Sequence, residues 1–304
     1  MNYEKFRDLF IEKIKERVGD NIKVKTNTVT KNNGKLKEGL IVETGNTLLP
    51  MIYLDELYEK YNQNGIMEEI LETVISLING NPNNIKERVE TLINGGWDKI
   101  KDTIEVCVIN KEWNKDKLEN IPHIEYLDLA LVFRVVIYRE EDSSMSCLMT
   151  NSLLNKLQID IEEFKNEALS RLNSSYYYIQ TLTGVIKECM QSEDEEEMFD
   201  SIIENSVCDV PLYVLTNKQR LNGAAGIARV DIINKFANEM EDDLYILPSS
   251  LHELLLLPAK ENCSVDELRE MVRSVNESEV DKEDWLSDNI YFFNRERGSL
   301  EIAV

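Results

Sequence analysis

Hydrophobic residues recur at helical spacing through the first eighteen positions of the chain. The apolar stripe consists of Phe6, Leu9, Phe10, Ile14 and Val18. Lysine and glutamate fill most positions between them, which places charge on the opposite face of a helix. Gly19 follows, and glycine commonly ends helices because it adopts left-handed backbone angles freely. The pattern predicts an amphipathic helix over residues 3–18.

The pattern changes to alternation after this helix. Ile22, Val24 and Thr26 alternate with polar residues, and Asn-Asn-Gly at residues 32–34 separates them from an apolar run at residues 40–42. Alternation interrupted by such a turn is typical of a β-hairpin, because the turn residues accept the tight backbone geometry. We therefore expect two paired strands in this region.

Helical spacing and apolar runs predict the remaining elements. We expect helices at residues 54–78 with a break near residue 65, 81–96, 113–118, 160–172, 228–240 and 264–276. We expect strands at residues 104–109, 123–139, 146–151, 211–217, 243–248, 252–258 and 289–302, the last with a final hairpin. The run at 123–139 is predicted as one buried central strand. Ser264 and Glu267 have the spacing of a capping box.

These elements predict an α+β fold, with a mixed or antiparallel sheet or sheets covered by helices. We expect an N-terminal α+β region at residues 1–118 and a C-terminal α+β domain at residues 119–304. The segments at 148–169 and 214–240 each run strand, Thr-Asn, spacer and helix. They are two possible strand–helix units that would lie side by side on one sheet.

Composition and charge narrow the function classes. The 304 residues are 42% hydrophobic and 30% charged, as in a soluble globular protein, and carry a net charge of −23. This charge repels nucleic-acid phosphates, so direct nucleic-acid binding is not expected. An acidic protein can instead mimic nucleic acid and bind a basic protein. The segment Glu188–Asp209 concentrates acids, and it is either an exposed helix start or a partner-binding patch.

Targeting, membrane and metal signals are missing from the sequence. The charged N-terminus does not resemble a signal peptide, and no apolar run is long enough for a membrane span. Five scattered cysteines without a CxxC pair favour reduced thiols and a cytoplasmic location. A zinc HExxH motif starting at His252 would need a second histidine at the position of Leu256. We expect no metal site and no cofactor.

The segment "LPSSLHELLLLPAK" supplies the first candidate chemistry. Ser249, Ser250, His252 and Glu253 are the residue types of a nucleophile, a base and an orienting acid. Neighbouring residues on a strand point to opposite faces, so His252 and Glu253 would not share a proton. A Pro-Ser-Ser turn that joins two strands explains the same residues structurally, and this interpretation is favoured.

The loop "TNKQRLNGAAGIAR" supplies the second candidate site. Asn217, Arg220, Asn222 and Gly223 lie between a predicted strand and a predicted helix. Backbone amides at a helix start can bind a phosphate. The loop lacks the Walker pattern and the dinucleotide fingerprint, and small residues at this position usually permit close packing of helix on sheet. Close packing is the favoured interpretation.

Several of these segments together resemble a known family. "PHIEYLDLALVFRV", "LTNKQRLNGAAGI", "LYILPSSLHELLLLPA", "LREMVRSVNESEV" and "LSDNIYFFNRERG" resemble the bacterial domain of unknown function 5688, over nearly the whole chain. A fainter similarity concerns the uncharacterised UPF0354-type family. The resemblance implies a cytoplasmic bacterial protein and assigns no activity to any residue.

The leading hypothesis is a non-enzymatic interaction or regulatory protein with a strongly acidic surface, including the special case of an inhibitor that mimics nucleic acid. Its partner would be a basic protein. The alternative is a hydrolase or a nucleotide- or anion-binding enzyme. Its site would be formed by the Asn217–Asn222 and Ser249–Glu253 segments, which the fold would then have to bring into one cleft.

Overall fold

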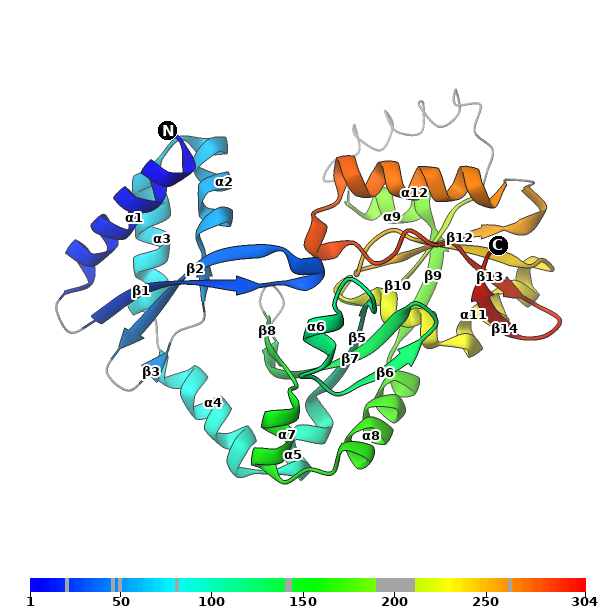
Figure 1. The fold of residues 1–304 in the computed structure, drawn as a ribbon, viewed down its shortest axis with the longest axis horizontal. Coiled ribbons are helices and arrows are strands. Elements are labelled where there is room, and N and C mark those ends of the chain that lie inside the picture. The colour runs from blue at the N-terminus through cyan, green and yellow to red at the C-terminus, as the bar shows by residue number, and fades with distance from the viewer. Residues whose placement is uncertain are drawn as a thin grey trace. The chain divides into compact units, whose positions relative to one another are not determined.

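The computed structural model describes residues 1–19, 22–44, 47–48, 51–79, 82–139, 144–189, 211–261 and 264–304. Helices and sheets both occur along the whole chain, and the strand pairs are antiparallel (Figure 1). The predicted α+β fold is confirmed. The acidic segment Glu188–Asp209 lies outside the described residues beyond Cys189. Among the described helices, none combines the length and the apolar character that crossing a bilayer requires.

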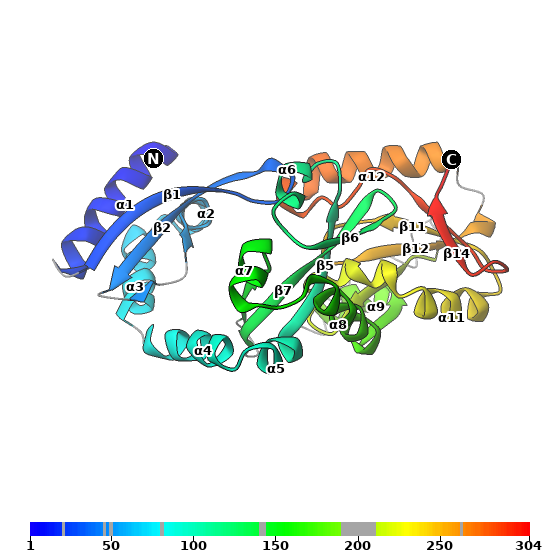
Figure 2. The same cartoon turned by 60° about the horizontal axis from the view of Figure 1, so that its bottom comes forward.

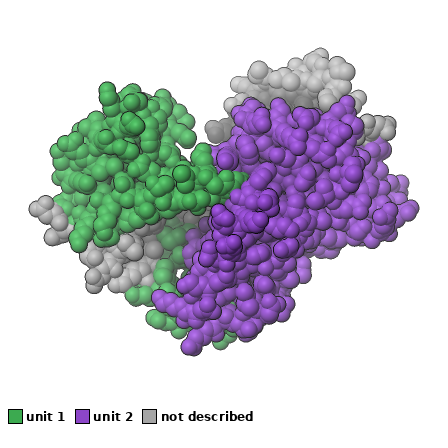
Figure 3. Space-filling model, in the orientation of Figure 1, with its two compact units in different colours: residues 1–100, 137–145 green, residues 101–136, 146–304 purple. Residues whose placement is uncertain are grey.

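The chain forms two compact units (Figure 3). Unit 1 comprises residues 1–100 and 137–145, and unit 2 comprises residues 101–136 and 146–304. The main division therefore follows Ile100, whereas the sequence pattern predicts it after residue 118. Strand β5 (Ile104–Asn110) explains the difference, because it pairs along its length with a strand of the C-terminal part.

Unit 1 packs helices on a small antiparallel sheet. Its elements are α1 (Tyr3–Val18), β1 (Ile22–Thr30), η1 (Asn32–Gly34), β2 (Leu36–Thr44), β3 (Thr47–Leu48), β4 (Ile52–Tyr53), α2 (Leu54–Asn64), α3 (Met67–Asn79), α4 (Pro82–Asn94) and α5 (Trp97–Ile100). The predicted α1 and the predicted hairpin β1–β2 are confirmed. The helical stripe of Phe6, Phe10 and Ile14 is fully buried against the sheet and helices α2 and α3.

A four-stranded antiparallel sheet leads into unit 2. It contains β5, β6 (His123–Tyr126), β7 (Leu129–Arg139) and β8 (Ser144–Leu148), with β7 in the middle, and the short η2 (Lys101–Thr103) and α6 (Lys115–Leu118) flank β5. The prediction of one strand over residues 123–139 is wrong. Leu127 has a φ of 55°, so the chain turns there and β6 pairs back on β7 as a hairpin.

The second sheet of unit 2 has six strands in the order β14-β13-β11-β12-β10-β9. They are β9 (Tyr177–Thr181), β10 (Tyr213–Asn217), β11 (Leu244–Pro248), β12 (Leu254–Pro258), β13 (Tyr291–Asn294) and β14 (Ser299–Ile302). The other elements are α7 (Asn151–Leu157), α8 (Ile161–Ser174), α9 (Leu182–Cys189), η3 (Gly223–Ala228), α11 (Val230–Met240), η4 (Ala259–Glu261), α12 (Val265–Glu279) and η5 (Lys282–Asp284).

Alternation along β11 and β12 separates two layers of core. Leu247 and Leu257 pack with Leu268 and Val272 of α12. Leu254 and Leu256 point to the other face of the sheet and are fully buried there. Figures 1 and 2 show α12 on one side of this sheet and α11 on the other. The two strand–helix units do not share a sheet, because β8 belongs to the four-stranded sheet and β10 to the six-stranded one.

Candidate functional site

The sheet brings the two candidate loops together. Leu254, the first residue of β12, pairs with Leu215 of β10 on one side and with Pro248 of β11 on the other. The loops that follow β10 and β11 therefore leave the sheet at the same edge. This adjacency depends on strand order, because β12 follows both β10 and β11 in the sequence and yet lies between them in the sheet.

Backbone contacts lock the loops to each other. The Thr216 hydroxyl donates a hydrogen bond of 2.8 Å to the carbonyl of His252, and the Ala224 amide donates one of 3.2 Å to the carbonyl of Leu251. A Cβ atom at Gly223 would lie 2.2 Å from Thr216 Oγ1 and 2.5 Å from the His252 carbonyl oxygen. Only glycine fits between the loops.

The His252 ring accepts a hydrogen bond at one nitrogen and faces a carboxylate with the other. Its Nδ1 accepts a hydrogen bond of 3.1 Å from the Asn222 amide, so the neutral ring carries its proton on Nε2. Nε2 faces Asp284 Oδ1 at 3.6 Å, and about one third (34%) of the side chain is exposed. Within the described part of the chain, no hydroxyl group hydrogen-bonds to either ring nitrogen. The ring therefore joins the loop after β10 to the segment after α12.

The serines and Glu253 shape the turn between β11 and β12. Ser250 Oγ accepts a hydrogen bond of 3.0 Å from the His252 amide, and the Ser250 amide donates one of 3.3 Å to the carbonyl of Glu253. Ser249 and Glu253 are half-buried on either side of this turn. A nucleophilic serine would donate its proton to the imidazole, and no such hydrogen bond from Ser250 is present among the described residues.

Asn217 and Arg220 are held within the second loop. Asn217 Oδ1 accepts hydrogen bonds from the amides of Gln219 and Leu221 at 3.1 and 3.3 Å, which closes the loop as a turn. Arg220 forms an ion pair with Glu188 of α9 and lies 3.4 Å from the Tyr178 hydroxyl. A carboxylate therefore already neutralises the Arg220 guanidinium, and anion binding by this loop stays a prediction.

A pocket of about 550 Å³ in unit 2 was not predicted from the sequence. Its polar lining includes Asn110, Lys111, Glu112, Asp128, Arg273, Ser287, Asp288 and Asn289, with Trp113, Leu127 and Ile302 as apolar walls. Carboxylates neutralise the two cationic side chains of this lining, since Lys111 lies 3.0 Å from Glu125 and Arg273 lies 3.2 Å from Glu270. Among the described residues, no group of three or more His, Cys, Asp and Glu side chains is placed to hold a metal ion.

Asp128 is the centre of the pocket's hydrogen bonds. Its carboxylate accepts from the Ser287 hydroxyl at 2.6 Å, the Asn289 amide group at 3.0 Å and the Tyr291 hydroxyl at 2.9 Å. Burial, reinforced by the charge of Asp128, raises the pKa of Tyr291 well above its ordinary value. The phenol therefore stays protonated and donates. With three donors bound, this carboxylate fixes the segment between α12 and β13.

The segment between α12 and β13 also connects the pocket to the His252 corner, that is, to the turn at residues 249–253. The Leu251 amide donates a hydrogen bond of 2.9 Å to the carbonyl of Asp284, and the Asn110 side chain donates one of 3.2 Å to the carbonyl of Leu286. Trp113 and Trp285 meet edge to face between them, with ring centroids 6.3 Å apart. Both candidate regions are thus parts of one hydrogen-bonded framework.

Comparison with known proteins decides the family. The model of a family of unknown function, DUF5688, matches residues 3–295 of the chain. The chain belongs to this family. No curated protein and no solved structure matches it. The resemblance to DUF5688 predicted from the sequence segments is confirmed, and the fainter similarity to the UPF0354-type family stays a prediction.

Segments that carry the DUF5688 resemblance meet around Asp128. This residue lies in "PHIEYLDLALVFRV", and Ser287, Asn289 and Tyr291 lie in "LSDNIYFFNRERG". The sequence offered one signal that could have pointed to this pocket, namely the aspartate between Leu127 and the apolar residues 129–133. This aspartate marks a hairpin turn, and its partners more than 150 positions away could be found only in the folded chain.

Proposed function

We propose that this DUF5688 protein is a non-enzymatic interaction protein that binds a basic partner through the carboxylates of its C-terminal two thirds. Residues 1–100 contain sixteen acids and fourteen basic residues, whereas residues 101–304 contain 41 acids and twenty basic residues. Almost all of the excess negative charge therefore belongs to the second span, at −21 against −2. Such a field steers a positively charged partner toward the surface.

The main structural support for this proposal is the exposed face of α12. Met271 is 56% exposed and Val275 is 41% exposed, and residues four apart lie on the same helical face. Glu267 lies four residues before Met271 and Glu279 four residues after Val275, so both add exposed carboxylates to the same face. Apolar side chains rimmed by one sign of charge are typical of a protein interaction surface, because burial supplies affinity and the charges supply specificity.

The His252 corner supports a binding function over the hydrolase alternative. Nδ1, the nitrogen that carries the lone pair of the neutral ring, already accepts from the Asn222 amide, and no serine hydroxyl among the described residues hydrogen-bonds to the ring. A base whose lone pair is bound to a backbone amide cannot take up a substrate proton in this geometry. We therefore assign the Ser249–Glu253 and Asn217–Asn222 segments to the framework.

The experiment is affinity capture with immobilised full-length protein, followed by titration of the purified partner. The wild type should retain proteins of high isoelectric point that elute as salt rises, because screening weakens charge attraction. The double variant Met271→Lys/Val275→Lys should raise the partner's Kd by about tenfold or more, since it removes apolar contact and adds repulsion.

Leu77→Lys is the matched control. Leu77 is 60% exposed on α3 of unit 1, so this variant makes the same chemical change on another exposed helix. It should leave capture and Kd unchanged. If the α12 double variant keeps the same basic proteins with wild-type affinity, or if the wild type retains none, the proposed function is wrong.

A further inference from the structure

Strand β1 presents a long free edge in unit 1. It has nine residues, and among the described strands it pairs only with β2. About half of its residues direct their N–H and C=O groups away from β2, as in any antiparallel edge strand. At about 3.3 Å per residue, this edge spans roughly 30 Å. An edge of this length is a template for pairing with another extended chain.

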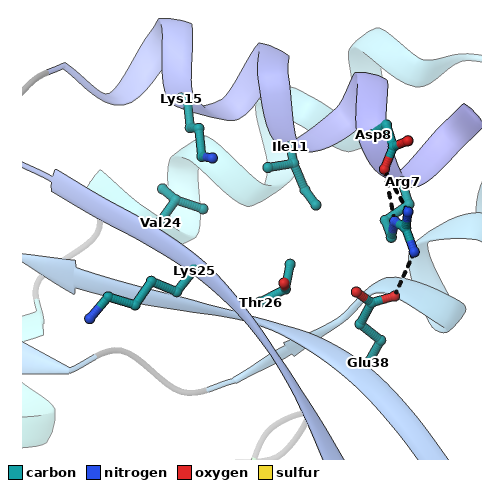
Figure 4. Close-up of a pocket in the computed structure, with 8 residues that line it drawn as sticks. All are labelled: Arg7, Asp8, Ile11, Lys15, Val24, Lys25, Thr26 and Glu38. Carbon is teal, nitrogen blue, oxygen red and sulfur yellow. Dashed lines mark hydrogen bonds and ion pairs between the residues drawn. The ribbon is translucent and has the colours of Figure 1, made fainter. Parts of the chain in front are cut away.

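A groove of about 400 Å³ runs between this strand and helix α1 (Figure 4). The side chains that line it include Arg7, Ile11 and Lys15 from α1, Val24 and Thr26 from β1, and Glu38 from β2. Residues 7, 11 and 15 each follow a residue of the buried stripe, so they form the flank of α1 beside the core contact. Ile11 and Val24 supply apolar surface inside the groove.

The charge of this region is opposite to that of the whole chain. Residues 1–40 contain ten basic residues and six acids, and residues 22–37 contain five lysines and no acid. Arg7 is compensated by Asp8 at 2.8 Å and Glu38 at 3.6 Å, and Lys25 by Glu43 at 2.8 Å. Lys15 points into the groove in Figure 4 and has no ion pair with any residue that the structure describes. It supplies uncompensated positive charge.

We propose that this groove binds an extended, acidic peptide segment of a partner protein, which adds to β1 as a further strand. The peptide main chain would pair with the free edge of β1, its alternate side chains would contact Ile11 and Val24, and a carboxylate would pair with Lys15. A sugar–phosphate backbone offers no alternating donors and acceptors, so the free edge favours a peptide over a nucleic acid. This surface lies in unit 1 and is independent of the function proposed for α12.

The test uses the full-length protein and a labelled nine-residue peptide that alternates glutamate and valine, with binding followed by fluorescence anisotropy. Wild-type protein should bind it at low salt. Lys15→Glu should raise Kd by about tenfold, because attraction becomes repulsion. Lys5→Glu is the matched control, since Lys5 is exposed on the same helix and does not line the groove. It should leave Kd unchanged.

A second experiment tests whether the peptide main chain pairs with the edge of β1. In two further peptides, the amides of either the odd or the even residues are methylated, which removes the hydrogen-bond donors from one edge of the extended chain. One of them should lose binding and the other should keep it. Equal binding of both, no binding of the unmodified peptide, or equal affinity of the Lys15→Glu protein would overturn the proposal. Tighter binding of an equally labelled nine-nucleotide DNA strand would assign the groove to nucleic acid instead.

Discussion

At the scale of single residues, Gly223 decides how closely the two loops approach. The missing side chain lets the Thr216 hydroxyl reach the His252 carbonyl at 2.8 Å, and it keeps the Asn222 amide within 3.1 Å of the imidazole. Asn222 itself has a φ of 54°, a left-handed conformation that asparagine tolerates better than most residues. Asn222 therefore supplies the left-handed turn, and Gly223 supplies the space between the loops.

Gly223→Ala should lower the free energy of unfolding by about 2–3 kcal/mol, because the new methyl group overlaps two backbone-fixed atoms and the loops must separate. Urea denaturation measures this change. Gly184→Ala is the control, since its Cβ would meet only Thr181 Oγ1, at 3.0 Å. It should change stability by less than about 1 kcal/mol. Equal effects of both substitutions would refute the packing role of Gly223.

At the scale of elements, the first residue of helix α12 is determined by the residues next to it in the sequence. The Ser264 hydroxyl accepts from the Glu267 amide at 3.2 Å, and the Glu267 carboxylate accepts from the Ser264 amide at 3.1 Å. The Ser264 hydroxyl also donates to the Glu267 carboxylate at 2.9 Å, and this hydrogen bond, together with the one from the Ser264 amide, lowers the pKa of the Glu267 carboxyl. The predicted capping box is confirmed because its partners are three residues apart and need no tertiary contact.

Ser264→Ala should destabilise the protein by about 1 kcal/mol, since the first amides of α12 lose their acceptor. Thermal and urea unfolding monitored by circular dichroism report the loss. Ser274→Ala serves as the comparison, because Ser274 is exposed in the middle of the same helix. Alanine is the better helix former there, so this change should be neutral or slightly stabilising. A neutral Ser264→Ala would show that the cap contributes nothing.

At the scale of the whole molecule, buried phenols link stability to alkaline pH. The pKa values of Tyr3, Tyr126, Tyr177 and Tyr291 are all raised, and burial is the largest cause for each. A group whose pKa is raised on folding stabilises the native state fully below its unfolded pKa, here the ordinary value of 10.0. Its contribution is lost as pH rises further.

The free energy of unfolding should therefore fall above pH 10.0, and Tyr291→Phe should make this fall less steep, because one linked proton is removed. Urea titrations at successive pH values measure the slope. Ultraviolet absorbance of tyrosinate, recorded together with circular dichroism, provides the check. Reversible ionisation of all twelve tyrosines with the secondary structure intact would contradict the prediction.

The sequence by itself determined the elements whose signals are local. The stripe of Phe6, Phe10 and Ile14 marked α1, the alternation from Ile22 marked β1, and Ser264 with Glu267 marked the start of α12. These signals are local because helix and strand periodicity and capping involve residues only a few positions apart. The hairpin β6–β7 escaped prediction because its turn is made by the left-handed backbone of Leu127, and a leucine gives no sequence signal for a turn.

Tertiary structure decided which side chains meet. Strand order brought the loops after β10 and β11 to one sheet edge, and it gave His252 its partners Asn222 and Asp284. It also placed three donors from one segment on Asp128 and left the outer edge of β1 free among the described strands. Periodicity specifies which face of an element is buried, whereas pairing between distant strands depends on the packing of all elements at once.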